Sequence, residues 1–92
     1  MIRSFRCPET RALFETGRSR RFTNIAVVAM RRLMALDAAD EMRDLRSPPG
    51  NRLEALRGDR TGQHSIRINE QFRICFIWAG NGAEQVEIVD YH

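Results

Sequence analysis

The stretch Gln63–His92, QHSIRINEQFRICFIWAGNGAEQVEIVDYH, decides the fold. It contains three β-type runs, separated by Asn69-Glu70 and by residues 79–82. In the first two runs the apolar side chains recur at every second position, at Ile66, Ile68, Phe72, Ile74, Phe76 and Trp78. A period of two indicates strands with one buried apolar face and one partly polar face. The segment Gly80–Gly82 is typical of a hairpin turn, so we expect sequential antiparallel strands.

The polar side chains of this stretch gather on the other face of the predicted sheet. Arg67 and Arg73 both fall on the polar parity of their strands, and the third run ends in Asp90, Tyr91 and His92. Side chains of one parity share a face of the sheet. We therefore expect two guanidinium groups, a carboxylate, a phenol and an imidazole to converge on one surface, the candidate functional site.

The chain before this stretch has helical signals. A short strand is expected at residues 2–5, and helices at residues 8–16, 24–36 and 38–45. Pro8 suits a first helical turn, and Gly17 suits a left-handed helix end. Thr23 or Asn24 is the expected N-cap of the second helix, and Asp37 that of the third.

The second helix has an apolar stripe suited to packing on the sheet, formed by Ile25, Val28, Ala29, Leu33 and Leu36. Val27, Met30 and Met34 lie off that stripe and broaden it. This helix is therefore either deeply buried or covered by something outside the chain.

The order of these elements predicts the fold class. A strand, helices and then three sequential strands favour an α+β domain over residues 1–92, in which N-terminal helices pack on one face of a small antiparallel sheet. The other face would be partly open, with Arg67 and Arg73 directed toward it.

Composition excludes several classes of protein. The 92 residues are 42% hydrophobic and 29% charged, as in one ordinary globular domain. No apolar run approaches the ~18 residues that a membrane helix needs, and the N-terminus lacks a secretory signal, so a cytoplasmic location is expected. The spacing of Cys7 and Cys75 fits buried thiols better than a disulfide framework or a zinc site. No glycine-rich phosphate loop follows a strand, and we expect no metal and no cofactor.

The basic residues are unusual in kind. All 15 are arginine, and the formal net charge is +3. Arginine makes bidentate contacts with phosphate and stacks on bases, which favours a nucleic-acid partner. A codon bias in a GC-rich genome explains the absence of lysine equally well.

The candidate surface has the groups that cleavage of RNA requires. The ribose 2′-hydroxyl attacks the adjacent phosphorus when a base accepts its proton and an acid protonates the leaving oxygen. His92 is the natural proton-transfer group, Arg73 would stabilise the transition state, and Tyr91 would contact a phosphate or stack on a base. Taken singly, a terminal histidine is more often part of a solvated terminus, a strand arginine more often a salt-bridge donor, and a tyrosine here more often an aromatic at the core edge.

The whole chain resembles the HigB toxins of the RelE/ParE superfamily, and within them the GraT-like members. The similarity runs through five stretches, Met1–Phe5, Asp44–Leu56, Gly62–Ile66, Gln71–Phe76 and Val86–His92. The resemblance implies a ribosome-dependent mRNA endonuclease that acts in the ribosomal A site. It also implies control by a HigA-type antitoxin with a helix-turn-helix, which would be the only contact with DNA.

The resemblance also assigns residues. The basic position before a Gly-Asp turn falls on Arg57, the strand arginine on Arg73 and the catalytic terminus on Asp90, Tyr91 and His92. Arg67 is a looser match to a second strand arginine, and Arg60 and His64 complete the expected RNA-binding set. Where some HigB toxins have a histidine, Glu54 stands here, which implies slower cleavage or a role for this carboxylate.

Two other functions remain open from the sequence. One is a gyrase poison of the ParE kind, in which the C-terminal strand is a docking surface and proton transfer is irrelevant. The other is a plain RNA-binding domain, although the aromatic residues fall mainly on the core-facing parity and would leave few stacking platforms exposed.

Overall fold

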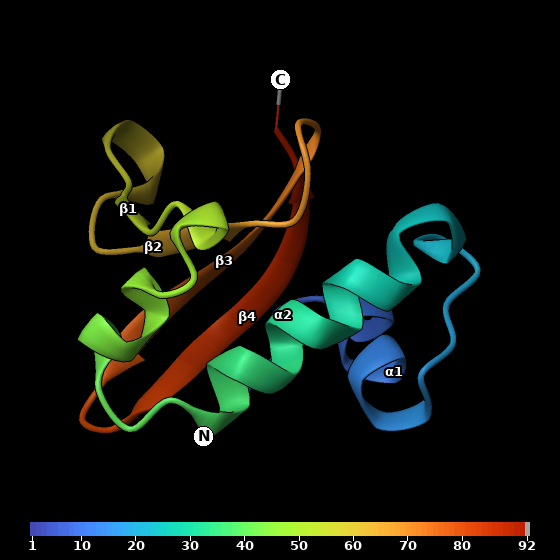
Figure 1. Cartoon of the computed structure of the whole chain (residues 1–92), viewed down its shortest axis with the longest axis horizontal. Coiled ribbons are helices and arrows are strands. Elements are labelled where there is room, and N and C mark those ends of the chain that lie inside the picture. The colour runs from blue at the N-terminus through green and yellow to red at the C-terminus, as the bar shows by residue number, and fades with distance from the viewer. Residues whose placement is uncertain (92) are drawn as a thin grey trace.

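The computed structural model describes residues 1–91 and has the predicted α+β architecture, with two α-helices on one face of a four-stranded antiparallel sheet (Figure 1). The strands are β1 (Glu54–Ala55), β2 (His64–Arg67), β3 (Phe72–Ala79) and β4 (Gly82–Asp90), in that spatial order. The helices are α1 (Pro8–Thr16) and α2 (Ala26–Ala38). Four 3-10 turns complete the described chain: η1 (Thr23–Ile25), η2 (Met42–Arg46), η3 (Pro49–Asn51) and η4 (Gly58–Arg60).

The three C-terminal strands confirm the sequence pattern. Ala79 pairs with Gly82, so β3 and β4 form the expected hairpin, in which Gly80 has a φ of 65° that side-chain-bearing residues rarely adopt. In β2 and β3 the registered partner of Arg67 is Arg73. Strand β1 is an addition that the sequence pattern did not predict, since it has only two residues, both exposed.

The core lies between the sheet and the helices. Its sheet side is formed by the predicted apolar parity, with Ile66, Ile74 and Phe76 fully buried. Leu13 of α1 and Leu33 of α2 are equally inaccessible and meet them from the other layer. Alternation in the strands and the apolar stripe of α2 together therefore fix which face of the sheet the helices cover.

The outer edge of β4 is covered by the N-terminal segment. Arg3 N donates to the carbonyl of Ala83 at 2.7 Å, and Val86 N donates to that of Ser4 at 3.1 Å. These contacts are two isolated parallel bridges, so the strand expected at residues 2–5 is not continuous. Farther along, Ile88 N donates to the hydroxyl of buried Thr10 at 3.0 Å. The edge thus keeps few unpaired backbone groups, which would otherwise invite another strand.

Helix α1 matches its prediction, and the capping of α2 does not. Gly17 ends α1 with a φ of 75°, as expected. The turn η1 precedes α2, and neither Thr23 nor Asn24 caps it. The hydroxyl of Thr23 donates instead to the carbonyls of Ser19 and Arg20. The capping prediction failed because η1 intervenes, so that Ile25, which has no capping side chain, is the N-cap of α2.

The third α-helix was also a wrong prediction. Helix α2 continues to Ala38, and the carboxylate of Asp37 accepts a hydrogen bond from Ile2 N at 2.8 Å instead of capping a new helix. The following segment forms the 3-10 turn η2, with a capping box between Glu41 and Asp44. Asp37 thus holds the N-terminal segment. Asp37 and Ile2 are 35 positions apart in the chain, and local sequence does not reveal such a contact.

Within residues 1–91, no helix is both long and apolar enough to cross a membrane.

Candidate functional site

A polar cleft of about 370 Å³ opens on the side of the sheet away from α1 and α2. It lies where the C-terminal end of β4 runs beside the turn between β2 and β3 (Figure 1). Six residues line it, namely Arg52, Arg67, Asn69, Glu70, Arg73 and Tyr91. Three of these six are arginines, so the cleft is suited to an anionic ligand.

Arg73 is the most constrained of these arginines. Its side chain is on the face predicted from strand alternation, but the residue is only 7% exposed. Its Nε donates to the hydroxyl of Ser65 at 2.7 Å, and its Nη2 donates to the carbonyl of Arg52 at 2.6 Å. The carboxylate of Glu54 lies 3.9 Å from the same Nη2. The expectation of an open face is therefore wrong at Arg73, because residues 52–54 pack over its guanidinium.

The turn that presents this carbonyl is anchored by a buried side chain. Asn51 is fully buried, and its Nδ2 donates to the carbonyls of Leu45 and Ser47 at 3.1 and 3.2 Å. The next residue, Arg52, takes a left-handed φ of 44°, which costs energy in a residue with a side chain. The anchored turn thus sets the direction of the Arg52 carbonyl toward the sheet.

Arg67 stands directly opposite Arg73 in the β2–β3 register. Side chains of such a pair have Cβ atoms ~5 Å apart, and like charges there destabilise the sheet. Arg67 is half-buried and its Nε donates to the carbonyl of Asn69 at 3.1 Å. Tyr91 covers the other side of Arg73, with the guanidinium carbon 5.9 Å from its ring centroid. The structure therefore brings together three of the predicted site residues, Arg67, Arg73 and Tyr91.

Asp90 does not lie on the surface of Arg73. Its registered partner in β3 is Phe72, whose side chain packs against the core, so Asp90 has the parity of the helix side. Its carboxylate accepts a hydrogen bond from Gln71 Nε2 at 3.0 Å. The predicted convergence is therefore wrong for Asp90. Val89 shares the face of Arg73, and Asp90, the next residue of the strand, has the opposite parity. His92 lies outside the described residues.

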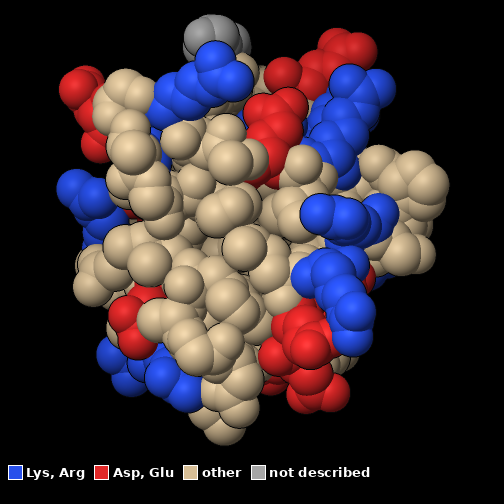
Figure 2. Space-filling model, turned by 90° about the vertical axis from the view of Figure 1, so that its left-hand side faces the viewer, with Lys and Arg blue, Asp and Glu red and all other residues tan. Residues whose placement is uncertain are grey.

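His64 also lies on the other face of the sheet. It pairs with Phe76, and their rings stack with centroids 6.3 Å apart. It lines a separate hollow of about 250 Å³ with Met42, Arg43, Arg46, Leu53 and Ala55. Figure 2 shows the side of the molecule that bears β1, where an uncharged centre is bordered by arginines interspersed with carboxylates. His64 is therefore separated from the cleft by the sheet.

The other two predicted RNA-binding residues belong to the segment around η4. Arg60 is occupied by the side-chain oxygen of Gln63 at 3.0 Å and the carboxylate of Glu87 at 3.5 Å. Arg57 is exposed at the start of η4 and does not line the cleft. Of these two arginines, only Arg57 has its side chain largely in solvent.

Cys75 lies on the same face of the sheet as Arg73, beneath the charged side chains of Arg60 and Glu87. Burial raises the pKa of its thiol, and the Arg60 guanidinium opposes this effect in part. A protonated thiol is a poor nucleophile, so Cys75 is a structural side chain. The prediction of a buried thiol is confirmed for Cys75, whereas Cys7 is half-buried and contacts the carboxylate of Glu9.

Sequence reasoning missed two supports of the site. Ser65 was recognisable by its polar parity on the same strand as Arg67, but a serine there is equally typical of a solvated strand face. The role of Arg52 rests on a backbone carbonyl, and every residue has one. Its nearness to Arg73 depends on the course of the chain through η3.

Comparison with known proteins agrees with the resemblance seen in the sequence. The sequence model of one family, described as the RelE-like toxin of the type II toxin–antitoxin system HigB, matches residues 3–92. The chain belongs to this family. The expectation from resemblance is thereby confirmed at the level of the family.

Three relatives show how far the sequence similarity extends. The toxin HigB-1 of Vibrio cholerae is 48% identical over 56 residues, and an uncharacterised protein of Haemophilus influenzae is 37% identical over 59. These alignments cover 61% and 64% of this chain, and they span 59% and 58% of the two relatives. The endoribonuclease HigB of Proteus vulgaris is 33% identical over 93 residues, which covers both proteins completely.

The fold is shared with YoeB, a protein of much lower sequence similarity. The structure is similar to the YoeB dimer of Staphylococcus aureus, with a TM-score of 0.56 and 16% identity over 99% of this chain and 97% of that one. YoeB in its complex with YefM gives a TM-score of 0.55, with 15% identity over 100% and 98% of the two chains. The two proteins thus share a fold.

The first prediction concerns the hydroxyl that holds Arg73. Ser65→Ala removes the acceptor of the Arg73 Nε, and hydrogen bonds to charged groups contribute about 1.5–3 kcal/mol. We expect the free energy of unfolding to fall by about that amount, measured by urea denaturation followed by circular dichroism. The control Ser47→Ala, at an exposed position, should change it by less than about 0.5 kcal/mol. Equal stabilities of the two variants would contradict the assigned role of Ser65.

Proposed function

We propose that this chain is the toxin of a toxin–antitoxin module and an endoribonuclease that cleaves mRNA in the ribosomal A site, thereby inhibiting translation. Membership of the HigB-like family supports the first part. The name of the Proteus vulgaris relative, which aligns over its full length, supports the second. The observation that carries the proposal is that Arg67 and Arg73, registered partners in β2 and β3, both line the cleft.

Two arginines that line one cleft favour a bound anion. Repulsion between Arg67 and Arg73 is relieved when a phosphate lies between them. The hydrogen bonds of Arg73 to Ser65 and Arg52 fix its orientation before any ligand arrives. A donor that is already oriented stabilises the extra negative charge of a phosphorane-like transition state without reorganisation. The cleft is thus suited to phosphodiester chemistry as well as to binding.

The proposed reaction needs no nucleophile from the protein. The 2′-hydroxyl loses its proton to a base, its oxygen bonds to phosphorus, and the 5′-oxygen leaves with a proton from an acid. The products are a 2′,3′-cyclic phosphate and a 5′-hydroxyl end. We assign Arg73 to the transition-state charge, Arg52 and Arg67 to the phosphate, and Tyr91 to stacking on a base or bonding a phosphate oxygen.

Proton transfer is assigned to the carboxylate of Glu54 and to the imidazole of His92. Glu54 is the carboxylate beside Arg73, and its side chain is 53% exposed, which leaves it accessible to substrate. His92 retains the role that its chemistry and the family resemblance give it. Asp90 has the opposite parity, so we propose that it orients the terminal residues without touching the phosphate. Arg57, exposed on η4, would contact RNA outside the cleft.

The proposed partners follow from this reaction. Substrate orientation would come from the ribosome, which supplies part of the rate by holding the mRNA in position. The chain would then act in the cytoplasm and be held in check by a HigA-type antitoxin with a helix-turn-helix. The toxin–antitoxin nature of the family supports an antitoxin partner.

The second prediction is the activity itself. Purified chain added to a translation extract freed of antitoxin should cleave mRNA on translating ribosomes and leave naked RNA nearly intact, as read by primer extension. Intact mRNA would contradict the proposal. DNA breaks that depend on gyrase, without loss of mRNA, would instead identify a gyrase poison.

The third prediction concerns Arg73. Arg73→Ala should cleave at least about a hundredfold more slowly in single-turnover assays at saturating ribosome, since loss of one oriented donor costs about 10²–10³ in rate. Arg73→Lys should recover only part, because an ammonium keeps the charge but lacks the planar fork. Circular dichroism must show that both variants fold, since this side chain is 7% exposed. Parental rates in ribosome-bound Arg73→Ala would make Arg73 a binding contact only.

The fourth prediction concerns Glu54. If this carboxylate accepts the 2′-hydroxyl proton, Glu54→Gln should lower the single-turnover rate by about 10² or more. Glu54→His should restore cleavage, because an imidazole also accepts a proton near neutral pH. Glu15→Gln on α1, which removes the same charge far from the cleft, is the matched control. A Glu54→Gln variant as fast as this control would leave Glu54 only as a counter-charge to Arg73.

A further inference from the structure

Helix α2 has an apolar stripe on its outward side that no part of the described chain covers. Val27 is 73% exposed and Met34 is 58% exposed, and Met30 lies between them half-buried. The spacing of three and four residues places them on one side of the helix, over ~10 Å of its length. With Gly17, Ala26 and Arg31 they line a groove of about 400 Å³. Isolated exposed apolar residues are ordinary, but a contiguous stripe along a groove is typical of a binding surface.

A basic loop borders this groove. The residue after Gly17 is Arg18, and the loop continues through Arg20 and Arg21 to η1. Arg21 lies 3.8 Å from the carboxylate of Glu9. Within residues 1–91, neither Arg18 nor Arg20 forms an ion pair with a carboxylate. Two guanidinium groups are therefore available for carboxylates of another molecule.

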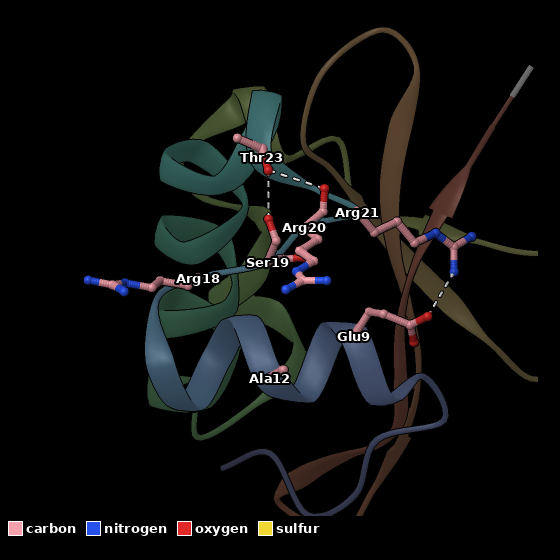
Figure 3. A pocket seen from close by; sticks show the side chains of 7 residues that line it. All are labelled: Glu9, Ala12, Arg18, Ser19, Arg20, Arg21 and Thr23. Atoms are coloured by element: carbon pink, nitrogen blue, oxygen red, sulfur yellow. Dashed lines mark hydrogen bonds and ion pairs between the residues drawn. The ribbon is translucent and has the colours of Figure 1, made fainter.

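The loop has a defined shape. The hydroxyl of Thr23 donates to the carbonyls of Ser19 and Arg20 at 2.7 and 3.2 Å, and the hydroxyl of Ser19 accepts from Phe22 N at 3.1 Å. Figure 3 shows Arg20 over the hollow between this loop and α1, and Arg18 extending away from it. That hollow has a volume of about 790 Å³. Side-chain-to-backbone hydrogen bonds thus hold the arginine-bearing backbone in place before a partner binds.

We propose that the α2 groove and the loop Arg18–Arg21 together form the docking surface for the antitoxin. The part that binds would be a segment with apolar side chains at helical spacing, flanked by carboxylates. The apolar side chains would fill the groove beside Met30 and Met34, and the carboxylates would pair with Arg18 and Arg31. This inference rests on the toxin–antitoxin assignment, because it takes the antitoxin as the partner.

The chemistry of the surface separates this occupant from two others. RNA offers phosphates to the arginines but would leave the methionine stripe facing a charged backbone, at a cost in desolvation. A second copy of the chain, packed about a two-fold axis, would bring Arg31 near its own equivalent. An acidic and apolar protein segment satisfies both the stripe and the border.

The fifth prediction tests this surface with the HigA-type antitoxin of the proposed module. Met34→Glu should weaken the affinity of the toxin for that antitoxin at least about tenfold in isothermal titration calorimetry. In the complex, a carboxylate would replace an apolar contact and would repel the acidic residues of the antitoxin segment. The variant should fold, since the side chain is 58% exposed. Gln85→Glu adds the same charge at an exposed position of β4 outside the groove, and should leave the affinity within about twofold.

Each outcome separates this inference from its rivals. An unchanged affinity in Met34→Glu, with Val27→Glu also unchanged, would overturn it. If the toxin alone forms dimers in sedimentation and Met34→Glu abolishes them without affecting antitoxin binding, the occupant is a second copy and the inference fails. If Met34→Glu loses the antitoxin although the parental chain does not cleave mRNA, the docking surface stands and the endonuclease proposal falls.

Discussion

The candidate site depends on one buried guanidinium. Arg73 is 7% exposed, and a charge in that position is stable only when its N–H groups have acceptors. The hydroxyl of Ser65 and the carbonyl of Arg52 provide them, at 2.7 and 2.6 Å. The Ser65 hydroxyl comes from the neighbouring strand and the Arg52 carbonyl from an irregular turn anchored by fully buried Asn51. The sheet, the turn and the arginine are therefore coupled, and a change in one would be felt by the others.

The two faces of the sheet therefore have different roles. The apolar face packs on the helices and supplies the core, where Ile66 and Ile74 are fully buried. The other face is also closed near Cys75, but by polar contacts that leave a cleft at the end of β4. A buried polar network of this kind specifies one arrangement, because an unpaired member would be costly. Orientation of a charge, which catalysis requires, is thus obtained from the same contacts that close the fold.

The cleft and the α2 groove lie on different layers of the molecule. The cleft is formed by strands and the turn that ends at Arg52, whereas the groove belongs to the helix layer and its basic loop. Substitutions at Met34 and at Arg73 therefore act on surfaces that share no lining residue, and their effects are expected to be independent. The effect of a substitution on cleavage and its effect on antitoxin binding can then be measured separately.

Much of this protein was determined by its sequence alone. The alternation from Ile66 to Trp78 predicted the strands and their buried face, and Pro8 and Gly17 marked the ends of α1, because side-chain period and backbone conformation are local properties. The tertiary structure alone decided which polar residues meet. It placed Asp90 and His64 on the helix side, closed the face over Arg73, and used Asp37 to hold the N-terminus instead of starting a helix. The physical reason is that register and the course of an irregular turn bring together groups distant in sequence, and no local pattern encodes such contacts.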